Sequence, residues 1–561
     1  MLATAATGFA TGGPAGAVHP TAGTSPTVAA PSVGAFPGSP GADRPNILFV
    51  LADDMDLPLL AAMPNVRRLV AEQGSTLTDF YVSSASCCPS RTTTLRGQFA
   101  HNTGVKSNGG TNGGFDTAHR LHVEDDTIAT RLQRAGYRTG LFGKYLNKYP
   151  GTAGAGYVPP GWTRWVSPVA GQPYSGYNYT LSVDGAPETH GDLPSDYATD
   201  VLVDHADAFV EQSVAAGQPF FAYVAPFTPH FPSIPAPVDV GTFAGATAPR
   251  TPSFDQRDVS AMPALIRNAP RLGTEELAAM DRHYEMRLES LQAIDRGVGR
   301  LIDTLQADGA LDRTYVVFTS DNGYHIGQHR LPAGKETPYD TDVHMPFVVR
   351  GPGIAAGSTV AEMAMNVDLA PTFAAMAGIH RWSAWDGHSL LPALTGHPTP
   401  PARRRTAMLL EHWAVQTVWG RPSFTPWHGR AVTKPDEEAE ADPRLRPTYI
   451  PEPSAMAAVG GDSLHGEGDV DVDHAVLGDE ILYALITPVP DFRGVRTDRY
   501  LYVEYVNGDR ELYDAVADPD QMHNLAGTRP GLEHRLAARL AALRHCAGRT
   551  CRAAERAPAG P

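Results

Sequence analysis

The chain alternates short, continuously apolar runs with segments of helical periodicity, and this alternation limits the folds open to it. The apolar runs cover residues 46–52, 137–142, 219–224, 314–318 and 346–349. Such runs are typical of strands buried on both faces of a parallel sheet. Residues 284–305 carry the longest helical pattern, with apolar residues three and four positions apart. The order of these segments predicts an α/β fold with a large, mostly parallel sheet flanked by helices.

Two shorter helices are expected between these strands. Pro64 opens the first, because proline suits the first position of a helix, where its missing N–H would have no partner. Gly74 lies where this helix closes. Asp126 is suited to cap the second helix, which ends near Gly136.

Past about residue 400 the composition changes. Residues 414–485 are rich in Pro, Gly and acidic residues, which indicates a long surface insertion with little regular structure. Residues 500–506 and 511–513 flank the turn pair Asn507-Gly508 and predict a β-hairpin. Residues 533–543 predict a helix. A smaller C-terminal domain with an antiparallel sheet is therefore expected.

Composition also sets the expected domain boundaries. The first 42 residues contain no Lys, Arg, Asp or Glu and cannot bury enough surface to fold, so they are expected to be disordered. They are interpreted as a leader or the remnant of a secretory signal, with a plain linker as the alternative. The predicted parts are this leader (1–43), a catalytic domain (44–400), a C-terminal subdomain with the insertion (401–545) and a tail (546–561).

Polar side chains follow four of the apolar runs at the point where each run ends: Asp53-Asp54, Lys144, His230 and Asp321-Asn322. Open α/β sheets bind ligands at the carboxyl ends of their strands, so these groups are expected to meet at one edge. The acidic pairs and the asparagine offer only oxygen ligands, which suits Ca²⁺ or Mg²⁺ rather than zinc. Asp53-Asp54 alone could equally cap a helix or form a turn. Asp321-Asn322 in an equivalent place favours the metal site.

The most specific local signal is Cys87-Cys88-Pro89-Ser90-Arg91, followed by Leu95 four residues beyond the arginine. A vicinal cysteine pair, buried or disulfide-bonded, is the simpler alternative. The pentapeptide resembles the signature of the sulfatase family. In that family the first cysteine is oxidised to formylglycine (3-oxoalanine), an aldehyde that hydrates to a gem-diol. The resemblance implies that Cys87 is the precursor of the nucleophile and that a formylglycine-generating enzyme acts on the chain.

The resemblance extends to residues outside the pentapeptide, over about 44 to 400, and implies an alkaline-phosphatase-like sandwich. It implies that Arg91 holds the aldehyde hydrate, that Lys144 and Lys335 contact the sulfate, and that His230 is catalytic. It further implies one divalent cation beside formylglycine at Cys87, with the ligands Asp53, Asp54, Asp321 and Asn322. Calcium is the expected ion, with magnesium as the alternative.

Within the family, the chain is most similar to N-acetylglucosamine-6-sulfatases and their extracellular relatives. The segments that carry this likeness are residues 87–91, 143–147, 177–180 and 321–325. The implied substrate is a sulfated sugar, and loops near Asn147 and Tyr177 are expected to contact its ring.

One position departs from the broader family pattern. Many sulfatases carry a histidine two residues after the first lysine, where this chain has Leu146. The base that releases sulfate from the enzyme is therefore open. His325 is the candidate substitute, and a packing or hydrogen-bonding histidine is an equal alternative.

Charge and apolar content exclude some classes of protein. The net charge of −16 argues against nucleic-acid binding, which requires a basic patch. No apolar run reaches the ~18 residues that a membrane span needs. An anionic sulfate ester is weakly repelled by such a protein, so the site must supply its own positive charge.

The remaining two of the four cysteines bear on the cellular compartment. Cys546 and Cys551 have four residues between them and could form a short-loop disulfide or remain free thiols. Because cytosolic proteins rarely keep disulfides, this pair favours a secreted or extracytoplasmic protein.

These observations predict a sulfuric ester hydrolase that acts on a sulfated carbohydrate or an aryl sulfate. Two alternatives stay open. One is a phosphate or phosphonate ester hydrolase on the same scaffold, and the other is a non-catalytic protein that binds sulfated glycans. The full set of catalytic residue types argues against the second.

Overall fold

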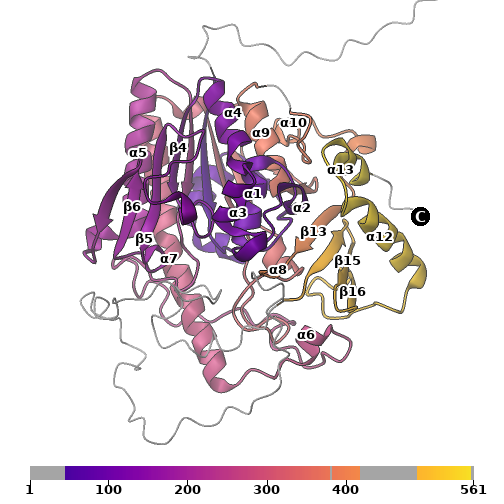
Figure 1. The fold of residues 1–561 in the computed structure, drawn as a ribbon. Helices are drawn as coiled ribbons and strands as arrows, with labels where there is room; N and C mark the ends of the chain where they lie inside the picture. The colour runs from indigo at the N-terminus through magenta and orange to yellow at the C-terminus, as the bar shows by residue number, and fades with distance from the viewer. Residues whose placement is uncertain (1–43, 380–381, 417–488, 557–561) are drawn as a thin grey trace, which may run out of the picture. The chain divides into compact units, whose positions relative to one another are not determined.

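The computed structural model describes residues 44–379, 382–416 and 489–556 (Figure 1). A ten-stranded sheet runs in the order β11-β2-β10-β9-β1-β8-β4-β5-β6-β7. The strands are β1 (Asn46–Ala52), β2 (Ser75–Leu77), β4 (Arg138–Gly143), β5 (Arg164–Gly171), β6 (Tyr179–Val183), β7 (Ala186–His190), β8 (Phe220–Ala225), β9 (Thr314–Ser320), β10 (Phe347–Arg350) and β11 (Ser358–Val360). The five central strands from β9 to β5 are parallel, whereas β10 and β6 pair antiparallel with the outer members of this group. The mostly parallel sheet is confirmed.

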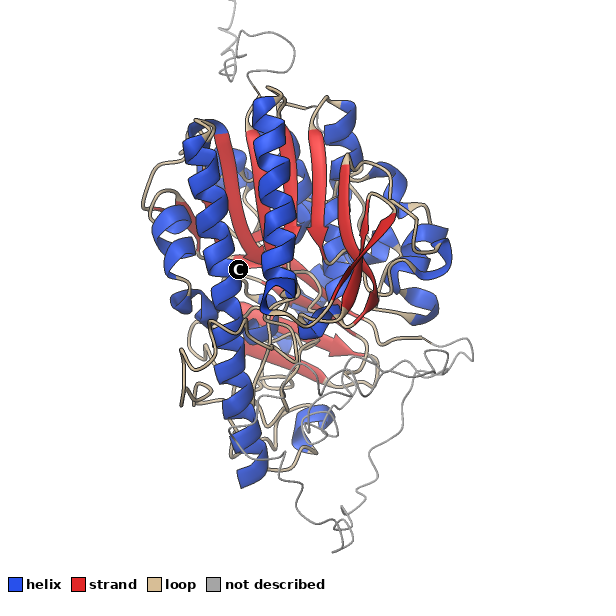
Figure 2. Cartoon of the chain, turned by 90° about the vertical axis from the view of Figure 1, so that its left-hand side faces the viewer, coloured by secondary structure: helices blue, strands red, loops and turns tan. Residues whose placement is uncertain are grey.

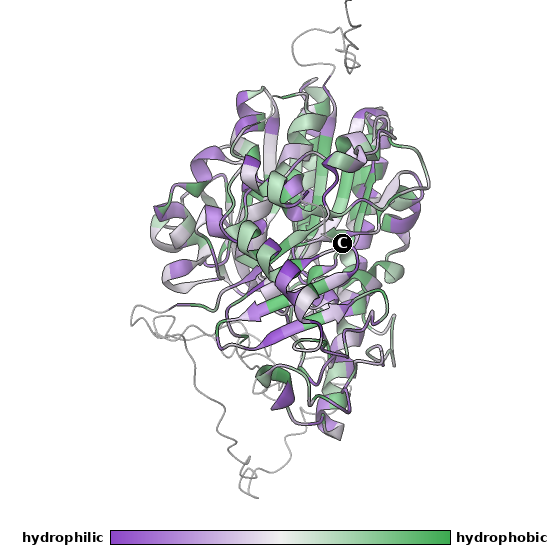
Figure 3. Ribbon diagram, turned by 90° about the vertical axis from the view of Figure 1, so that its right-hand side faces the viewer, coloured by the Kyte–Doolittle hydropathy of each residue, from purple (hydrophilic) through white to green (hydrophobic). Residues whose placement is uncertain are grey.

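Both faces of this sheet are covered by helices. Along β1, Ile47 and Phe49 enter one hydrophobic cluster and Leu48 and Val50 enter another, as the alternation of a strand requires. The first cluster includes residues of α1 (Cys87–Arg96), α4 (Ile128–Arg134) and α9 (Leu369–Met376). The second includes residues of α5 (Ala198–Ala215) and α7 (Thr274–Ala307). Figure 2 shows helices lying across one face of the sheet, and Figure 3 shows the apolar colouring of its strands.

Two predicted helices differ in detail from the structure. Thr127, not Asp126, caps α4, so that prediction is wrong. The Thr127 hydroxyl accepts a hydrogen bond from the Thr130 N–H at 3.3 Å, and the Thr130 hydroxyl accepts one from the Thr127 N–H at 3.0 Å. Asp126 instead accepts a hydrogen bond from Arg131 at 2.6 Å. The helix expected after Pro64 is a π-helix over Val66–Ala71.

A second sheet lies in the C-terminal part. Its order is β13-β14-β15-β16, all antiparallel, with strands β13 (Met408–His412), β14 (Phe492–Arg496), β15 (Tyr500–Tyr505) and β16 (Arg510–Asp514). The predicted hairpin and antiparallel sheet are confirmed. Helix α12 (Pro530–Leu543) packs against β14 and β15. Most of the predicted insertion, from residue 417 onward, lies outside the described residues.

The smaller elements complete the described chain. Two short strands, β3 (Phe80–Tyr81) and β12 (Ala364–Met365), pair in parallel. The short helices are α2 (Ala100–Thr103), α3 (Gly114–Arg120), α6 (Ala264–Arg267), α8 (Asp340–Val343) and α10 (Leu391–Leu394). Within the described part of the chain, no helix is long and apolar enough to span a bilayer.

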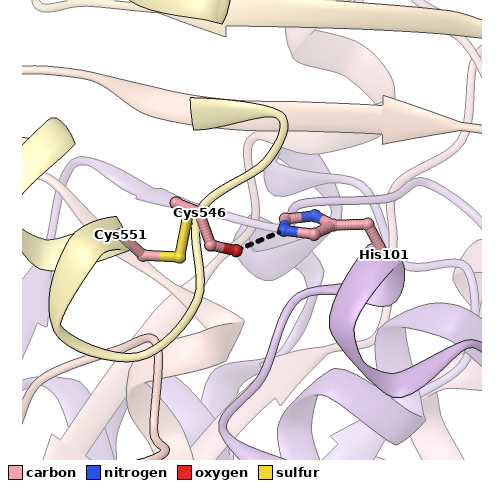
Figure 4. A group of neighbouring side chains, drawn as sticks. All are labelled: His101, Cys546 and Cys551. Carbon is pink, nitrogen blue, oxygen red and sulfur yellow. Dashed lines mark hydrogen bonds between the residues drawn. A yellow bond between two sulfur atoms is a disulfide. The ribbon is translucent and has the colours of Figure 1, made fainter. Parts of the chain in front are cut away.

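A short-loop disulfide lies near the end of the described chain, and hydrogen bonds to its first cysteine reach back to α2. Cys546 and Cys551 are bonded, so the predicted pairing is confirmed and these cysteines are not metal ligands (Figure 4). The Cys546 carbonyl accepts hydrogen bonds from His101 at 2.8 Å and from Asn102 at 2.9 Å. The other ring nitrogen of His101 lies 2.8 Å from the Glu411 carboxylate. Helix α13 (Arg549–Ala554) follows, within the range predicted as a tail.

A buried glutamate joins the C-terminal sheet to the central part of the chain. Glu511, on β16, is fully buried, and its carboxyl accepts hydrogen bonds from the hydroxyls of Tyr339, Tyr505 and Tyr513. Burial raises the pKa of Glu511 to about 7, although the three hydroxyls act in the opposite direction.

This glutamate should make stability fall with rising pH. Because the folded pKa lies above the unfolded one, the stabilising contribution is complete below pH ~4.5 and is lost as the pH rises through about 7. In Glu511→Gln this contribution cannot titrate. Between pH 5 and pH 8 the unfolding free energy of the variant should therefore improve relative to wild type, by up to about 3 kcal/mol. Denaturant melts of both proteins across this range measure the difference, and a pH-independent difference would contradict the prediction.

Candidate active site

The carboxyl ends of four neighbouring parallel strands carry the predicted polar residues. Asp53 follows β1, Asp321 follows β9, Lys144 follows β4, and His230 lies five residues beyond β8. Gly143 permits the turn into Lys144: its φ is +118°, and a Cβ there would lie 2.0 Å from the Ala225 carbonyl oxygen. The strand order therefore brings together residues that are far apart in the sequence.

Cys87 lies inside this group as the first residue of α1. It is fully buried, with its Sγ 3.5 Å from an Asp53 oxygen and 3.8 Å from an Asp54 oxygen. The Lys335 ammonium donates a hydrogen bond to the same sulfur at 2.7 Å. Burial raises the pKa of the Cys87 thiol well above its ordinary value, although Lys144 and Lys335 lower it. An unmodified Cys87 is therefore a neutral thiol at pH 7 and a weak nucleophile.

Arg91 is on the same helix, one turn after Cys87, and is fully buried. Its Nε donates to Asp321 at 2.7 Å, and one terminal nitrogen donates to the Lys144 carbonyl at 2.9 Å. The other terminal nitrogen lies 3.7 Å from Asp53 and makes no hydrogen bond among the described residues. Arg91 thus joins α1 to the ends of three strands.

Two lysines balance the first acidic pair. Lys144 donates to Asp53 at 2.5 Å, and Lys335 donates to Asp54 at 2.6 Å. Burial alone would raise the pKa of Asp53 and Asp54, but the nearby positive charges lower both below the ordinary value. Together with Asp321 and Arg91, the cluster holds three carboxylates and three cationic side chains. Their formal charges cancel, so an added anion would need further positive charge.

Asp54 is held in an unusual backbone conformation by a residue that the sequence reasoning missed. Its φ is +64°, which is uncommon for a residue other than glycine and is often found at functional sites. Arg287, fully buried on α7, donates to the Asp54 carbonyl at 2.8 Å and to Asp56 at 2.6 Å. The sequence did hold a signal for this contact: Arg287 is four positions before Leu291 on the apolar face of the predicted helix, where a charged side chain must be buried with a partner.

His230 lies at the side of the cluster, 7% exposed. Its Nε2 is 3.6 Å from Asp54, and its Nδ1 lies 2.7 Å from the Phe231 carbonyl oxygen, which can only accept a hydrogen bond. Nδ1 therefore donates. The ring of Tyr174, which the sequence reasoning also missed, packs against His230 at a centroid distance of 4.6 Å. Tyr177 belongs to the same loop, which was expected to contact the sugar; its own side chain packs against Tyr197 and is 9% exposed.

His325 lies outside this network of direct contacts. Its Nδ1 is 3.0 Å from each oxygen of Asp342, a fully buried carboxylate that also accepts hydrogen bonds from Thr337. This pairing fixes the ring through Nδ1. Among the described residues no contact joins His325 to Cys87, so its catalytic role stays a prediction.

The residues present fit a hard divalent cation. Ligand atoms of Asp53, Asp54, Cys87 and His230 all lie within 4.8 Å of one another. The side-chain oxygen of Asn322 is buried and has no hydrogen-bond partner among the described residues, while its amide donates to Asp54 at 2.6 Å. A buried oxygen without a donor, next to clustered carboxylates, is what an oxygen-coordinated cation would satisfy.

Comparison with known proteins assigns the family. The family model described as Sulfatase matches residues 45–379. The chain belongs to the sulfatase family. It is therefore a member of a family of sulfuric ester hydrolases, and the predicted family is confirmed.

Two curated relatives show how far the likeness extends. The chain is 37% identical over 431 residues to "Extracellular sulfatase SULF-1 homolog" of Drosophila melanogaster, covering 76% of this chain but only 37% of the fly protein. It is 32% identical over 526 residues to "N-acetylglucosamine-6-sulfatase" of Capra hircus, covering 91% of this chain and 85% of the goat protein. The second match includes most of the C-terminal part.

A solved structure shares the fold. It is a protein "in complex with its substrate D-Glucosamine-2-N, 6-O-disulfate", which superposes with a TM-score of 0.64 at 23% identity over 89% of this chain and 97% of that chain. At this identity the likeness concerns the fold alone, and the expected alkaline-phosphatase-like sandwich is confirmed.

Removal of the cation should abolish activity of the sulfatase. Chelation should stop turnover, and Ca²⁺ or Mg²⁺ should restore it. Asp321→Asn keeps an oxygen that can accept from Arg91 but removes one negative charge from the metal ligands. Metal content and activity should therefore fall together, and activity should fall at least ~100-fold. Asp303→Asn, at an exposed position of α7, is the control and should change neither. Metal analysis and thermal melts with and without Ca²⁺ provide readouts besides turnover; stoichiometric zinc in active enzyme would contradict the assignment.

Proposed function

We propose that this sulfatase releases inorganic sulfate from a sulfated sugar by means of a formylglycine formed from Cys87. The observation that carries the proposal is the position of Cys87: its Sγ lies within contact of Asp53, Asp54 and Lys335 in one buried cluster. Conversion to formylglycine and hydration would supply an oxygen nucleophile for attack on sulfur at this position.

The surrounding residues then have separate tasks. Arg91 and Lys144, both next to Asp53, hold positive charge beside the nucleophile and the sulfate oxygens. Lys335, paired with Asp54, does the same. Fixed cations of this kind stabilise the charge that develops during the reaction. A divalent cation, calcium or magnesium, held by Asp53, Asp54, Asp321 and Asn322 would supply the positive charge that the neutral cluster lacks.

Proton transfer is assigned to the histidines. His230 Nε2 would protonate the departing alcohol, because Nδ1 already donates to a carbonyl and an imidazole can act as an acid near neutral pH. His325, oriented by Asp342, is the proposed base for the step that releases sulfate. Its Nε2 is the atom left to accept the proton.

The proposed substrate is N-acetylglucosamine-6-sulfate, alone or at the end of a glycan. Support comes from the similarity to the goat protein named N-acetylglucosamine-6-sulfatase, which extends over most of both chains. A 6-sulfate is attached to a primary carbon and projects from the ring, so it can reach a nucleophile as deeply buried as Cys87. The disulfide and the extracellular fly relative support a secreted or extracytoplasmic location.

Mass spectrometry of the peptide that contains Cys87 tests the nucleophile. In active enzyme from its native host, Cys87 should be present as an aldehyde and Cys88 as a thiol. Cys87→Ala should lose on the order of 10⁶-fold in turnover, as expected for a covalent nucleophile. Cys88→Ala is the matched control: Cys88 belongs to the hydrophobic core, so its loss should affect stability more than turnover. Active enzyme with both thiols intact would refute the mechanism.

Substrate comparison tests the alcohol and the acid. Sulfate release should be faster from N-acetylglucosamine-6-sulfate than from 2-O- or 4-O-sulfated sugars. His230→Ala should cost ~10²–10⁴-fold on the sugar but much less on an activated aryl sulfate, whose leaving group needs little protonation. Equal losses would contradict the acid role. Faster hydrolysis of a matched aryl phosphate than of the aryl sulfate would favour a phosphatase instead.

A further inference from the structure

Tyr174 lies against two residues of the proposed reaction without belonging to the charged cluster. It is part of a short 3-10 helix, Pro173–Ser175, in the loop between β5 and β6. The Lys144 ammonium lies 4.9 Å from the centre of its ring, and the His230 ring lies 4.6 Å away. Phe227 meets the ring edge-on at 4.8 Å. One aromatic side chain thus contacts both the proposed sulfate-binding lysine and the proposed acid.

Burial places Tyr174 on the outer side of these two residues. Lys144 is 3% exposed and His230 is 7% exposed, whereas Tyr174 is only half-buried. An alcohol that receives a proton from His230 must lie next to that imidazole. The sugar attached to this alcohol then extends toward solvent, past the side chain that borders His230 on the outside.

Hydrogen bonds outside the Tyr174 ring hold the backbone of this loop. The Ser175 hydroxyl donates to the Gln172 carbonyl at 2.7 Å, and the Gly176 N–H donates to the Pro173 carbonyl at 3.1 Å. Tyr177 and Tyr179 anchor the same loop from inside the protein. Tyr174 is therefore turned toward the site while its neighbours hold the backbone, so its replacement should leave the fold intact.

We propose that Tyr174 is a specificity-determining residue whose aromatic ring packs against the sugar ring that carries the sulfate. The inference rests on the proposed function and adds a binding residue to it. The C–H groups of a pyranose form an apolar surface, and an aromatic ring packed against that surface removes it from water. The sulfate group itself is bound by the cations of the buried cluster. Loss of the ring should accordingly weaken binding of the sugar and not of the anion.

Binding to protein that cannot turn over separates these contributions. In the Cys87→Ala background, calorimetry gives the Kd of N-acetylglucosamine-6-sulfate and of inorganic sulfate. Tyr174→Ala should raise the Kd of the sugar sulfate about 3- to 10-fold, as expected for the loss of one partly buried aromatic contact, and change that of inorganic sulfate by less than about twofold. Tyr174→Phe should leave both values unchanged, since the ring and not the hydroxyl makes the contact.

Three results would overturn the proposal. An equal loss for both ligands would show that the ring only supports the anion site. An unchanged Kd for the sugar sulfate in Tyr174→Ala would show that the ring does not contact the sugar. Binding of inorganic sulfate without any binding of the sugar sulfate would show the same. Turnover by the wild-type enzyme is measured separately: if it hydrolyses no sulfate ester, the proposed function fails, while the binding comparison still decides the role of Tyr174.

Discussion

Everything at the carboxyl end of the sheet depends on the burial of opposite charges in equal number. Asp53, Asp54 and Asp321 are almost completely buried, and Arg91, Lys144 and Lys335 approach them within hydrogen-bonding distance. Burying a charge without a partner is strongly unfavourable, and removing one partner leaves such a charge behind. The cluster therefore requires that β1, β4, β9 and α1 meet at one point. The same balance leaves the cluster neutral, which explains why an anionic substrate would need a cation as well.

The sequence predicts the parts of this arrangement that repeat a simple pattern. Apolar runs identify the central strands, and the polar residues that follow Ala52, Gly143 and Ser320 identify the edge where they gather. Capping was harder, because Asp126 and Thr127 are neighbours that both suit a helix start. Only the reciprocal hydrogen bonds with Thr130 decide between them.

Side chains that contact the site from distant parts of the sequence were not predicted. Arg287 supports the left-handed backbone of Asp54 from a helix more than 200 residues away in the sequence. The helical pattern of α7 predicts that Arg287 is buried but not which residue it contacts. Tyr174 lies in a short connection before β6, where Tyr174, Tyr177 and Tyr179 are separated by small or polar residues and no periodic pattern tells them apart. The sequence analysis named the loop near Tyr177 but not the residue within it; the fold turns Tyr177 inward and places Tyr174 beside His230. His325 remains a prediction, since its pairing with Asp342 suits an oriented base and a structural histidine equally.

The complete burial of Cys87 has a consequence for biosynthesis. Its side chain is closed in by strands that lie on both sides of it in the sequence, so no enzyme could reach the thiol once β9 and α1 have come together. The proposed oxidation must then occur while this part of the chain is still extended. Folding and modification compete in time, and a molecule that folds first keeps its thiol for as long as it stays folded. The specific activity of a preparation would thus record how fast the chain folded relative to how fast Cys87 was modified.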